Sequence, residues 1–228
     1  MSTPSRLLRD ISSVQLATIE RPILAIPVGS CEQHGPHLPL GTDSIVAEAL
    51  CAYLSAANSR VVVGPTLSVT SSGEHAGFAG TLSIGAPVTA SMIVELVRSA
   101  EWADSVVLVN GHGGNANAIT TAVATLRAES RRVTDWWPHI DGGDAHAGHI
   151  ETSLMLHLAA HLVDMGRAEA GDLRPLPEIA DELIRSGMRS VTSNGVLGDP
   201  RGASREDGER LFAQLVDQLI DHVARYHR

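Results

Sequence analysis

Ser105-Val106-Val107-Leu108-Val109 runs directly into Asn110-Gly111-His112-Gly113-Gly114-Asn115. The first of these segments is an unbroken apolar run, which is typical of a buried β-strand. The glycines that follow allow a tight turn, and a helix is expected from Asn115 or Asn117 to about Glu129. A strand, a glycine-rich turn and a helix in that order favour an α/β fold.

The same alternation of short apolar runs and helical periodicity recurs along the chain. Strands are expected over 23–28, 61–63 and 132–136, and helices over 42–58, 87–103, 151–163 and 206–227, with a short capped helix near Thr3-Pro4. Such an order predicts right-handed βαβ units, a mostly parallel sheet and helices on both faces. No long linker or repeat is present, so a single domain over 1–228 is expected.

Composition excludes several classes of protein. The formal charge is −9, without a basic cluster, so nucleic-acid binding is not expected. No apolar run approaches the roughly 18 residues that span a bilayer, and no signal-peptide pattern begins the chain. We therefore expect a cytoplasmic protein without a membrane partner. Two cysteines are too few for a disulfide scaffold.

The chemistry is concentrated after the predicted strands. Glu32, His34 and Asp43 follow the first strand, in a stretch rich in glycine and proline. Carboxylates and imidazoles at this density can bind divalent metal ions. His112 follows another strand, and the carboxyl ends of parallel strands share one edge of a sheet. The residues alone leave open whether His112 binds a ligand or caps the next helix.

A third segment, from Asp141 to Thr152, carries acids and imidazoles just before a predicted helix. Glu151 can point from the first turn of that helix towards the same sheet edge. An acidic residue there is also explained by the helix dipole alone. Three similar segments at loop-to-helix junctions favour a dinuclear metal site over three coincidences.

These segments resemble the signatures of the creatininase family. The matching stretches are Gly29 to Pro39, Thr42-Asp43, Asn110 to Asn115 and His146 to Ser153. The resemblance extends over roughly Ile23 to Gly198. It implies a three-layer α/β/α fold, a homo-oligomer and two divalent metal ions per subunit that cleave an amide C–N bond.

Residue roles follow from the resemblance by position. One ion would be held by Glu32, Asp43 and His112, and the other by His34 and Asp43. Creatininase itself has a metal-binding glutamate at the position of Gly114, so one carboxylate is missing here. The ions would be Zn²⁺, Fe²⁺ or Mn²⁺, because mixed carboxylate and imidazole ligands suit all three.

Glu151 is our candidate for the missing carboxylate, either as a metal ligand or as a general base. His146 matches the catalytic histidine of the family and would protonate the leaving nitrogen. The remaining pocket candidates are Glu74, His75, Gly113, Gly114 and Trp137. For Glu74 and His75, a solvated loop edge is an equally good interpretation.

Three functions remain open at this point. Asn194 to Pro200 and the segment around His146 resemble family members that cleave a modified precursor peptide and release its C-terminal Val-Tyr-derived dipeptide. The first hypothesis is therefore a metal-dependent peptidase with that peptide as its substrate. A second is an amidohydrolase of a small cyclic amide or a formamide, and a third is a metal-binding protein without turnover.

Overall fold

A parallel four-stranded sheet lies at the centre of the computed structural model, which describes residues 6–226. The strands are β1 (Ile23–Val28), β2 (Val61–Val63), β3 (Ser105–Asn110) and β4 (Val133–Trp136), in the order β2-β1-β3-β4. Ile23 pairs with Val61 on one side and with Ser105 on the other. The predicted parallel sheet is thus confirmed, and all four strands end at the same edge.

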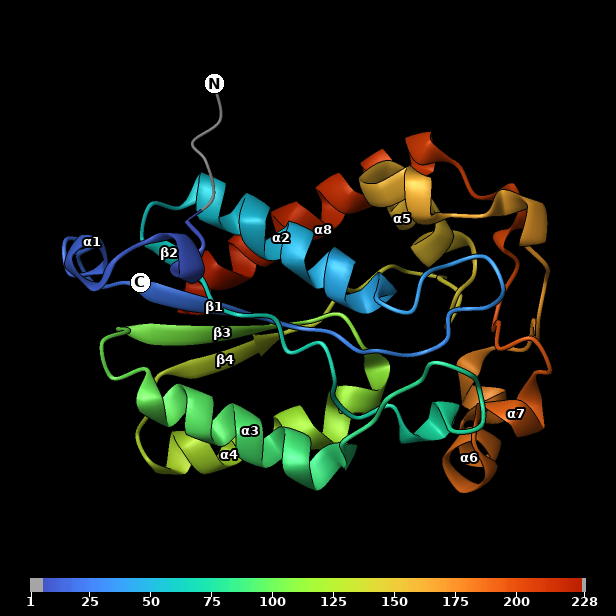
Figure 1. The fold of residues 1–228 in the computed structure, drawn as a ribbon, viewed down its shortest axis with the longest axis horizontal. Helices are drawn as coiled ribbons and strands as arrows, with labels where there is room; N and C mark the ends of the chain where they lie inside the picture. Colours follow the sequence, from blue (N-terminus) through green and yellow to red (C-terminus); the bar gives the residue numbers. More distant parts are fainter. Residues whose placement is uncertain (1–5, 227–228) are drawn as a thin grey trace.

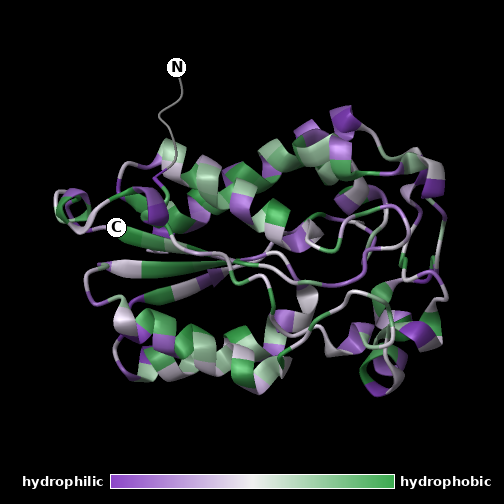
Figure 2. Cartoon of the chain, in the orientation of Figure 1, coloured by the Kyte–Doolittle hydropathy of each residue, from purple (hydrophilic) through white to green (hydrophobic). Residues whose placement is uncertain are grey.

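Helices cover both faces of this sheet (Figure 1). One face carries α2 (Thr42–Ala57), α5 (His149–Ala159) and α8 (Arg205–Tyr226), and the other carries α3 (Gly85–Ser99) and α4 (Ala116–Ala128). The strands are hydrophobic along most of their length, whereas the helices alternate hydrophobic and hydrophilic residues (Figure 2). Each helix therefore buries one face, and the three-layer α/β/α arrangement is confirmed.

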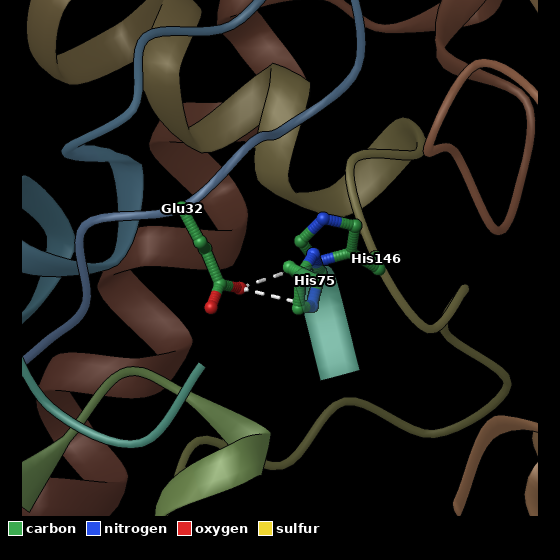
Figure 3. Close-up of side chains that lie close together, drawn as sticks. All are labelled: Glu32, His75 and His146. Carbon is green, nitrogen blue, oxygen red and sulfur yellow. Dashed lines mark ion pairs between the residues drawn. The ribbon is translucent and has the colours of Figure 1, made fainter. Parts of the chain in front are cut away.

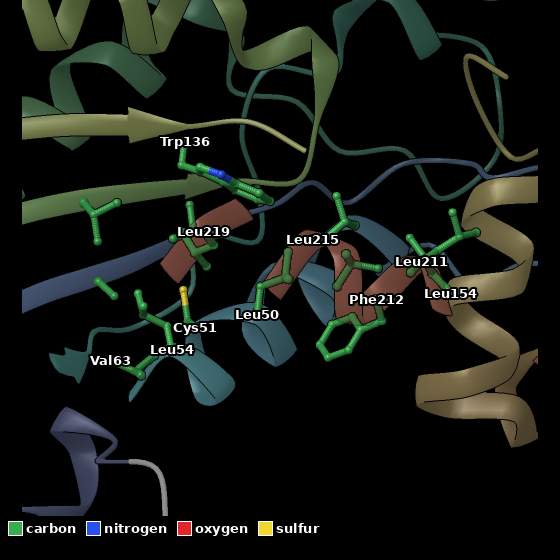
Figure 4. Close-up of a cluster of buried hydrophobic side chains, with 14 of the residues drawn as sticks. Leu50, Cys51, Leu54, Val63, Trp136, Leu154, Leu211, Phe212, Leu215 and Leu219 are labelled. Atoms are coloured by element: carbon green, nitrogen blue, oxygen red, sulfur yellow. The ribbon is translucent and has the colours of Figure 1, made fainter. Parts of the chain in front are cut away.

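The larger of the two main cores fixes the helices that lie nearest the candidate site. Leu50 and Leu54 of α2 pack with Leu215 and Leu219 of α8, and Trp136 closes this cluster from β4 (Figure 4). All four leucines are almost completely buried. Because a buried leucine contributes about 1.5–3 kcal/mol, this cluster holds α2 and α8 firmly against the sheet.

The amino-terminal region differs in detail from the expected capped helix. Thr3 and Pro4 lie outside the described residues. The described part forms a 3-10 turn, η1 (Leu8–Asp10), and one helical turn, α1 (Ser13–Leu16). The side chain of Ser12 accepts a hydrogen bond from the backbone N–H of Gln15, and the Gln15 side chain accepts one from the backbone N–H of Ser12. This capping box begins the helix later than the Thr-Pro pair indicates.

Two further helices, which are not among those expected above, lie beyond the carboxyl ends of the strands: α6 (Leu176–Ser186) and α7 (Met188–Val191) (Figure 1). They accompany five short 3-10 helices, η2 (Gly73–His75), η3 (Gly113–Asn115), η4 (Ala160–Leu162), η5 (Met165–Arg167) and η6 (Pro200–Gly202). No helix between residues 6 and 226 is both long and apolar enough to cross a membrane.

Candidate metal centre

Loops from all four strands meet at the carboxyl edge of the sheet. The loop after β1 supplies Glu32 and His34, and the long loop after β2 supplies His75. His112 follows β3, and His146 lies in the loop after β4. All five side chains are buried, although glutamate is almost never fully buried unless it is paired. The fold therefore collects ionisable groups at one point.

Glu32 is the residue of this cluster whose burial most needs an explanation. Its side chain is fully buried, and neither carboxylate oxygen has a hydrogen-bond partner of acceptable geometry among the described residues. His75 Nε2 lies 3.4 Å from Oε1 and His146 Nδ1 lies 3.9 Å from the same oxygen (Figure 3). His112 Nε2 is 3.1 Å from Oε2. A buried carboxylate without a donor is costly, and a nearby positive charge offsets that cost. Burial lowers the pKa of His112, but Asp43 and Glu32 outweigh it and raise that pKa well above its usual value, so Glu32 draws positive charge towards itself.

Asp43 lies in the first turn of α2 and presents its two oxygens to different histidines. His34 Nε2 is 3.0 Å from Oδ1, whereas His112 Nδ1 is 3.2 Å from Oδ2, which also accepts a hydrogen bond from Ser30. Burial favours the neutral acid, but His34 and His112 hold the pKa of Asp43 well below its usual range. Asp43 has the geometry of a bridging carboxylate between two sites.

His34 and Glu151 form the neighbouring part of the cluster. Their side chains are 3.8 Å apart, and the Ala147 N–H donates a 2.6 Å hydrogen bond to Glu151. Burial lowers the pKa of His34, but Asp43, Glu151 and Glu32 outweigh it and raise the pKa to about 10. Burial also raises the pKa of Glu151 to about 7, against the opposing effect of His34.

The helix that carries Glu151 begins two residues earlier than predicted. Asp144 accepts hydrogen bonds from the backbone N–H groups of His149 and Ile150, and so satisfies the first turn of α5. The helix therefore starts at His149 rather than at Glu151. The earlier start leaves Glu151 in the first turn, with its carboxylate at the sheet edge as expected.

His75 and His146 both lie beside the carboxylate of Glu32 (Figure 3). Burial lowers the pKa of His75 to about 4, and burial together with His34 and His75 holds the pKa of His146 well below its usual value. Both imidazoles are therefore neutral at pH 7, the form that binds metals and accepts protons.

Gln33 joins these two histidines and is not among the predicted residues. Its side-chain amide nitrogen lies 2.9 Å from His75 Nδ1, and its backbone carbonyl oxygen lies 2.9 Å from His146 Nε2. The same amide also donates to the carbonyl of Gly195. Gln33 thus fixes the orientation of both rings. Only its place between Glu32 and His34 could point to it in the sequence.

Three groups of side chains have ligand atoms that lie within 4.8 Å of one another. They are Glu32 with Asp43 and His112, His34 with His146 and Glu151, and Glu32 with His75 and His146. The first is the predicted ligand set. The second combines the predicted His34 and Glu151 with His146 rather than with Asp43. Donor types and burial both fit divalent metal binding.

Gly114 lies against this cluster with no space for a side chain. A Cβ there would lie 2.5 Å from the Ser71 carbonyl oxygen and closer still to Glu74 Oε1 and His112 Nε2. Glu74 Oε1 is itself 3.6 Å from His112 Nε2. The carboxylate of Glu74 therefore occupies the space that a longer residue at position 114 would need.

Two cavities, each of about 820 Å³, meet at the cluster. Asp43, His112 and Glu151 line both of them. We call the first the Trp137 cavity, because Trp137 and the segment that follows it form one of its walls. We call the second the α6 cavity, because much of α6 lines it together with Glu74 and His75. The predicted pocket residue Trp137 thus lines one cavity only, with its indole N–H donating to Asp135.

Sequence comparisons show to which known proteins the chain is similar. Residues 9–223 match the profile of the creatininase family, described as creatinine amidohydrolase. The chain is 45% identical to the mycofactocin precursor peptide peptidase of Mycobacterium tuberculosis (strain CDC 1551 / Oshkosh) over 90% of this chain and 86% of that protein. It is 27% identical to the creatinine amidohydrolase of Pseudomonas putida, with 88% of each chain covered.

Solved structures show the same fold. A creatininase crystal structure superposes with a TM-score of 0.81 at 24% identity, covering 98% of this chain and 99% of that one. A mutant creatininase described as Zn-Zn type gives a TM-score of 0.82 at 23% identity, covering 99% and 100%. With its fold, its buried carboxylate–imidazole cluster and a family match that extends over most of its length, the chain belongs to the creatininase family, hydrolases of C–N bonds.

Proposed function

We propose that this protein is the metal-dependent peptidase that cleaves an amide bond in a modified precursor peptide of mycofactocin biosynthesis. The product would be the C-terminal Val-Tyr-derived dipeptide. The hydrolytic part of the proposal is carried by one observation, the buried carboxylate of Glu32 among His75, His112 and His146 with no hydrogen-bond donor of acceptable geometry among the described residues. The choice of substrate is supported by relatives named mycofactocin precursor peptide peptidase, which are 42–45% identical to this chain.

Two divalent ions per subunit, Zn²⁺, Fe²⁺ or Mn²⁺, are part of this proposal. Glu32, Asp43 and His112 would hold one, and His34, Asp43 and Glu151 the other. Divalent ions in such a site lower the pKa of a water molecule and polarise the carbonyl that is attacked. The contacts of Asp43 with both His34 and His112 support its role in both sets.

The protein's own side chains would move the protons. Hydrolysis adds the oxygen of water to the carbonyl carbon, breaks the C–N bond and leaves one proton from the water on the nitrogen. His146 is neutral at pH 7, because burial and its histidine neighbours hold its pKa low, so it can take that proton first and then deliver it to the departing amine. Gln33 keeps the ring in place for both transfers.

Glu151 is suited to either of the two roles that the sequence leaves open. As a ligand it would complete the set around His34, which is 3.8 Å away. As a base it has a pKa near neutral pH, because burial raises the pKa of Glu151 to about 7. Metal analysis of Glu151→Gln separates the two, since loss of one ion identifies a ligand and full occupancy with slow turnover identifies a base.

The decisive experiment is incubation of the metal-loaded protein with the modified precursor peptide and a panel of small amides, followed by mass spectrometry. Release of the dipeptide, with no opening of creatinine or formamides, supports the proposal. Opened small amides with an intact peptide would instead support the second candidate, which the Pseudomonas putida relative favours. Bound metal without any hydrolysis would leave a metal-binding protein.

His146→Gln provides a sharper test of the mechanism. We expect kcat for peptide cleavage to fall about 10²- to 10⁴-fold, because one positioned acid–base group contributes that much, while both ions stay bound. Metal content by plasma mass spectrometry is the second readout. Loss of an ion in this variant would make His146 a ligand and contradict its proton-transfer role.

The proposal also includes a cytoplasmic location and a homo-oligomer of single-domain subunits.

A further inference from the structure

The side-chain amide of Gln33 has one possible orientation, because both of its ends meet backbone groups. The backbone N–H of Gly35 donates to its Oε1 at 2.9 Å, and its Nε2 donates to the carbonyl oxygen of Gly195 at 3.0 Å. Exchange of the amide oxygen and nitrogen would set an oxygen against a carbonyl oxygen and an N–H against an N–H. The amide nitrogen of Gln33 is therefore the atom that faces the histidines.

This orientation decides which ring nitrogen of His75 carries a proton. An amide nitrogen has two hydrogens and acts as a donor only. One hydrogen goes to the carbonyl of Gly195, and the other is left for His75 Nδ1, which lies 2.9 Å from the nitrogen. Nδ1 must therefore be unprotonated, and the proton of the ring lies on Nε2. His75 thus turns an N–H group towards Glu32.

His146 is the same tautomer but turns its other nitrogen to the candidate centre. Its Nε2 lies 2.9 Å from the backbone carbonyl oxygen of Gln33, which can only accept a hydrogen bond. Nε2 therefore carries the proton, and Nδ1 is the unprotonated atom of the neutral ring. Nδ1 lies 3.9 Å from Glu32 Oε1 (Figure 3). His146 thus offers a lone pair where His75 offers an N–H.

The N–H of His75 is placed to hold Glu32. Carboxylates that bind metals are usually hydrogen-bonded themselves, which fixes their direction. Glu32 Oε2 lies 3.1 Å from His112 Nε2, within the ligand set that includes Asp43, whereas Oε1 lies 3.4 Å from His75 Nε2. This separation allows an N–H···O hydrogen bond once the carboxylate turns onto an ion. One oxygen is then left for the metal and the other for His75.

The same proton argues against a third ion in the candidate centre. Glu32, His75 and His146 have ligand atoms within 4.8 Å of one another, so distance alone allows an ion between them. A histidine binds a metal through an unprotonated nitrogen. The unprotonated nitrogen of His75 is already held by Gln33, so this ring has no lone pair to give.

We propose that Gln33 fixes both rings as the Nε2–H tautomer and so divides their tasks. His75 is a positioning residue that holds the carboxylate of Glu32 through Nε2–H, whereas His146 takes up and returns the proton of the reaction at Nδ1. The tasks of Glu32 and His146 rest on the proposed function. The tautomers rest only on the hydrogen bonds of Gln33.

Nitrogen-15 spectra of the histidine side chains at pH 7 test the tautomers, in metal-free protein and in protein loaded with Zn²⁺. The chemical shift of a ring nitrogen shows whether it carries a proton, and the signals lost in His75→Gln and His146→Gln identify each ring. We expect a protonated Nε2 and an unprotonated Nδ1 in both rings, with and without Zn²⁺. A proton on Nδ1 of either ring, or Zn²⁺ on either nitrogen of His75, overturns the inference.

Gln33→Glu tests the cause. Its carboxylate has no hydrogen to donate, so Nδ1 of His75 should gain a proton. His146 should keep its tautomer, because its partner is the backbone carbonyl of residue 33. The exposed Gln214→Glu adds the same charge elsewhere and should change neither ring. An unprotonated Nδ1 of His75 in Gln33→Glu would show that Gln33 does not set the tautomer.

Zn²⁺ affinity, measured by competition with a chelator, tests the task of His75. His75→Leu should weaken binding about 10- to 100-fold, the usual effect of removing a group that orients a ligand. His75→Gln should restore most of that loss, because its amide can still donate to Glu32. Equal losses in the two variants would make His75 a ligand, and no loss in His75→Leu would remove its hold on Glu32.

Failure of the proposed function gives a different result. A protein that shows these tautomers and this order of Zn²⁺ affinities, but leaves the precursor peptide intact, would refute the peptidase and keep the roles of Gln33 and His75. A wild type that binds no Zn²⁺ would refute the task of His75, while the spectra of the metal-free protein still decide the tautomers.

Discussion

Gly114 lies so close to the candidate centre that even a methyl group does not fit there without a shift of its neighbours. A Cβ at this position would meet a flexible glutamate tip, a histidine ring and a backbone carbonyl, and the last two have little freedom to move. The ring of His112 is packed against its partners Glu32 and Asp43. A methyl group at this point must therefore displace a proposed ligand.

We expect Gly114→Ala to weaken metal binding by about 10- to 100-fold, the usual effect of disturbing groups that orient ligands. Gly113→Ala is the matched control, because a Cβ at position 113 meets nothing within 4 Å. Metal affinity is measured by competition with a chelator, and a far-ultraviolet spectrum checks that both variants fold. Equal affinities in the two variants would contradict the crowding at position 114.

His34 gives the second prediction at this scale, a pH dependence. Its neighbouring carboxylates raise the pKa to about 10 in the metal-free protein, whereas a metal binds the neutral ring. Protons therefore compete with metal below pH 10, and affinity should rise with pH by up to about tenfold per unit between about pH 7 and 9. Chelator competition at several pH values measures this, and a flat profile would refute it.

At the residue scale the sequence predicts Glu32, His34, Asp43 and His112, because each lies next to a recognisable strand or helix start. His75 is equally consistent with a solvated loop edge, because the loop after β2 has no periodic pattern. The carboxyl ends of parallel strands lie at one edge of a sheet, which brings the other site residues together. The same rule applies to the loop after β2 and favours a place for His75 in the site.

Among the elements, α5 and α8 make a close helix contact near the candidate metal centre. Gly208 of α8 lies against the backbone of α5, where a Cβ would overlap the Ser153 carbonyl oxygen and lie 2.9 Å from His157 Cβ. The absence of a side chain lets the two helices approach, and so helps to position the first turn that carries Glu151.

Gly208→Ala should destabilise the protein by about 1–3 kcal/mol, the usual cost of overpacking. In an exposed helix interior the same change stabilises by about 1 kcal/mol, so the sign itself is diagnostic. Denaturant unfolding measures the difference, with the exposed Glu209→Ala as the control, which should stay within about 0.5 kcal/mol of wild type. A more stable Gly208→Ala would show that the helices have room to separate.

The helix α6 is an element that the expected alternation of strands and helices does not include. Leu176, Ile179, Ala180, Leu183 and Ile184 follow helical spacing, and Pro177 lies in the first turn. That signal is present in the sequence, but the segment follows no strand and lies outside the alternation of strands and helices. Its exposed side chains line a cavity rather than a sheet, and nothing in a one-dimensional pattern reveals a cavity.

On the scale of the whole molecule, the centre ties together loops from every strand of the sheet. In the metal-free protein, neither oxygen of the buried Glu32 carboxylate receives a hydrogen bond of acceptable geometry from residues 6–226, and several carboxylates lie close together. Metal binding should therefore stabilise the entire fold by mass action, by about 2.7 kcal/mol at a free metal concentration about one hundred times Kd.

Removal of metal with a chelator should lower Tm by about 5–10 °C in a domain of this size. A single cooperative transition in both forms is expected for one domain over 1–228. Scanning calorimetry of the metal-loaded and metal-free protein measures both quantities. Equal Tm values would mean that no ion binds the folded state, and two separate transitions would contradict the single domain.

The two cavities meet at the centre, and this has a consequence for the order of steps in turnover. A substrate that extended from one cavity into the other would leave its two fragments in different cavities after cleavage, and neither fragment would have to pass the other to leave. Release of products is then random in order, and each fragment competes only with its own part of the next substrate. A shortened peptide that dissociates slowly would not trap the dipeptide behind it.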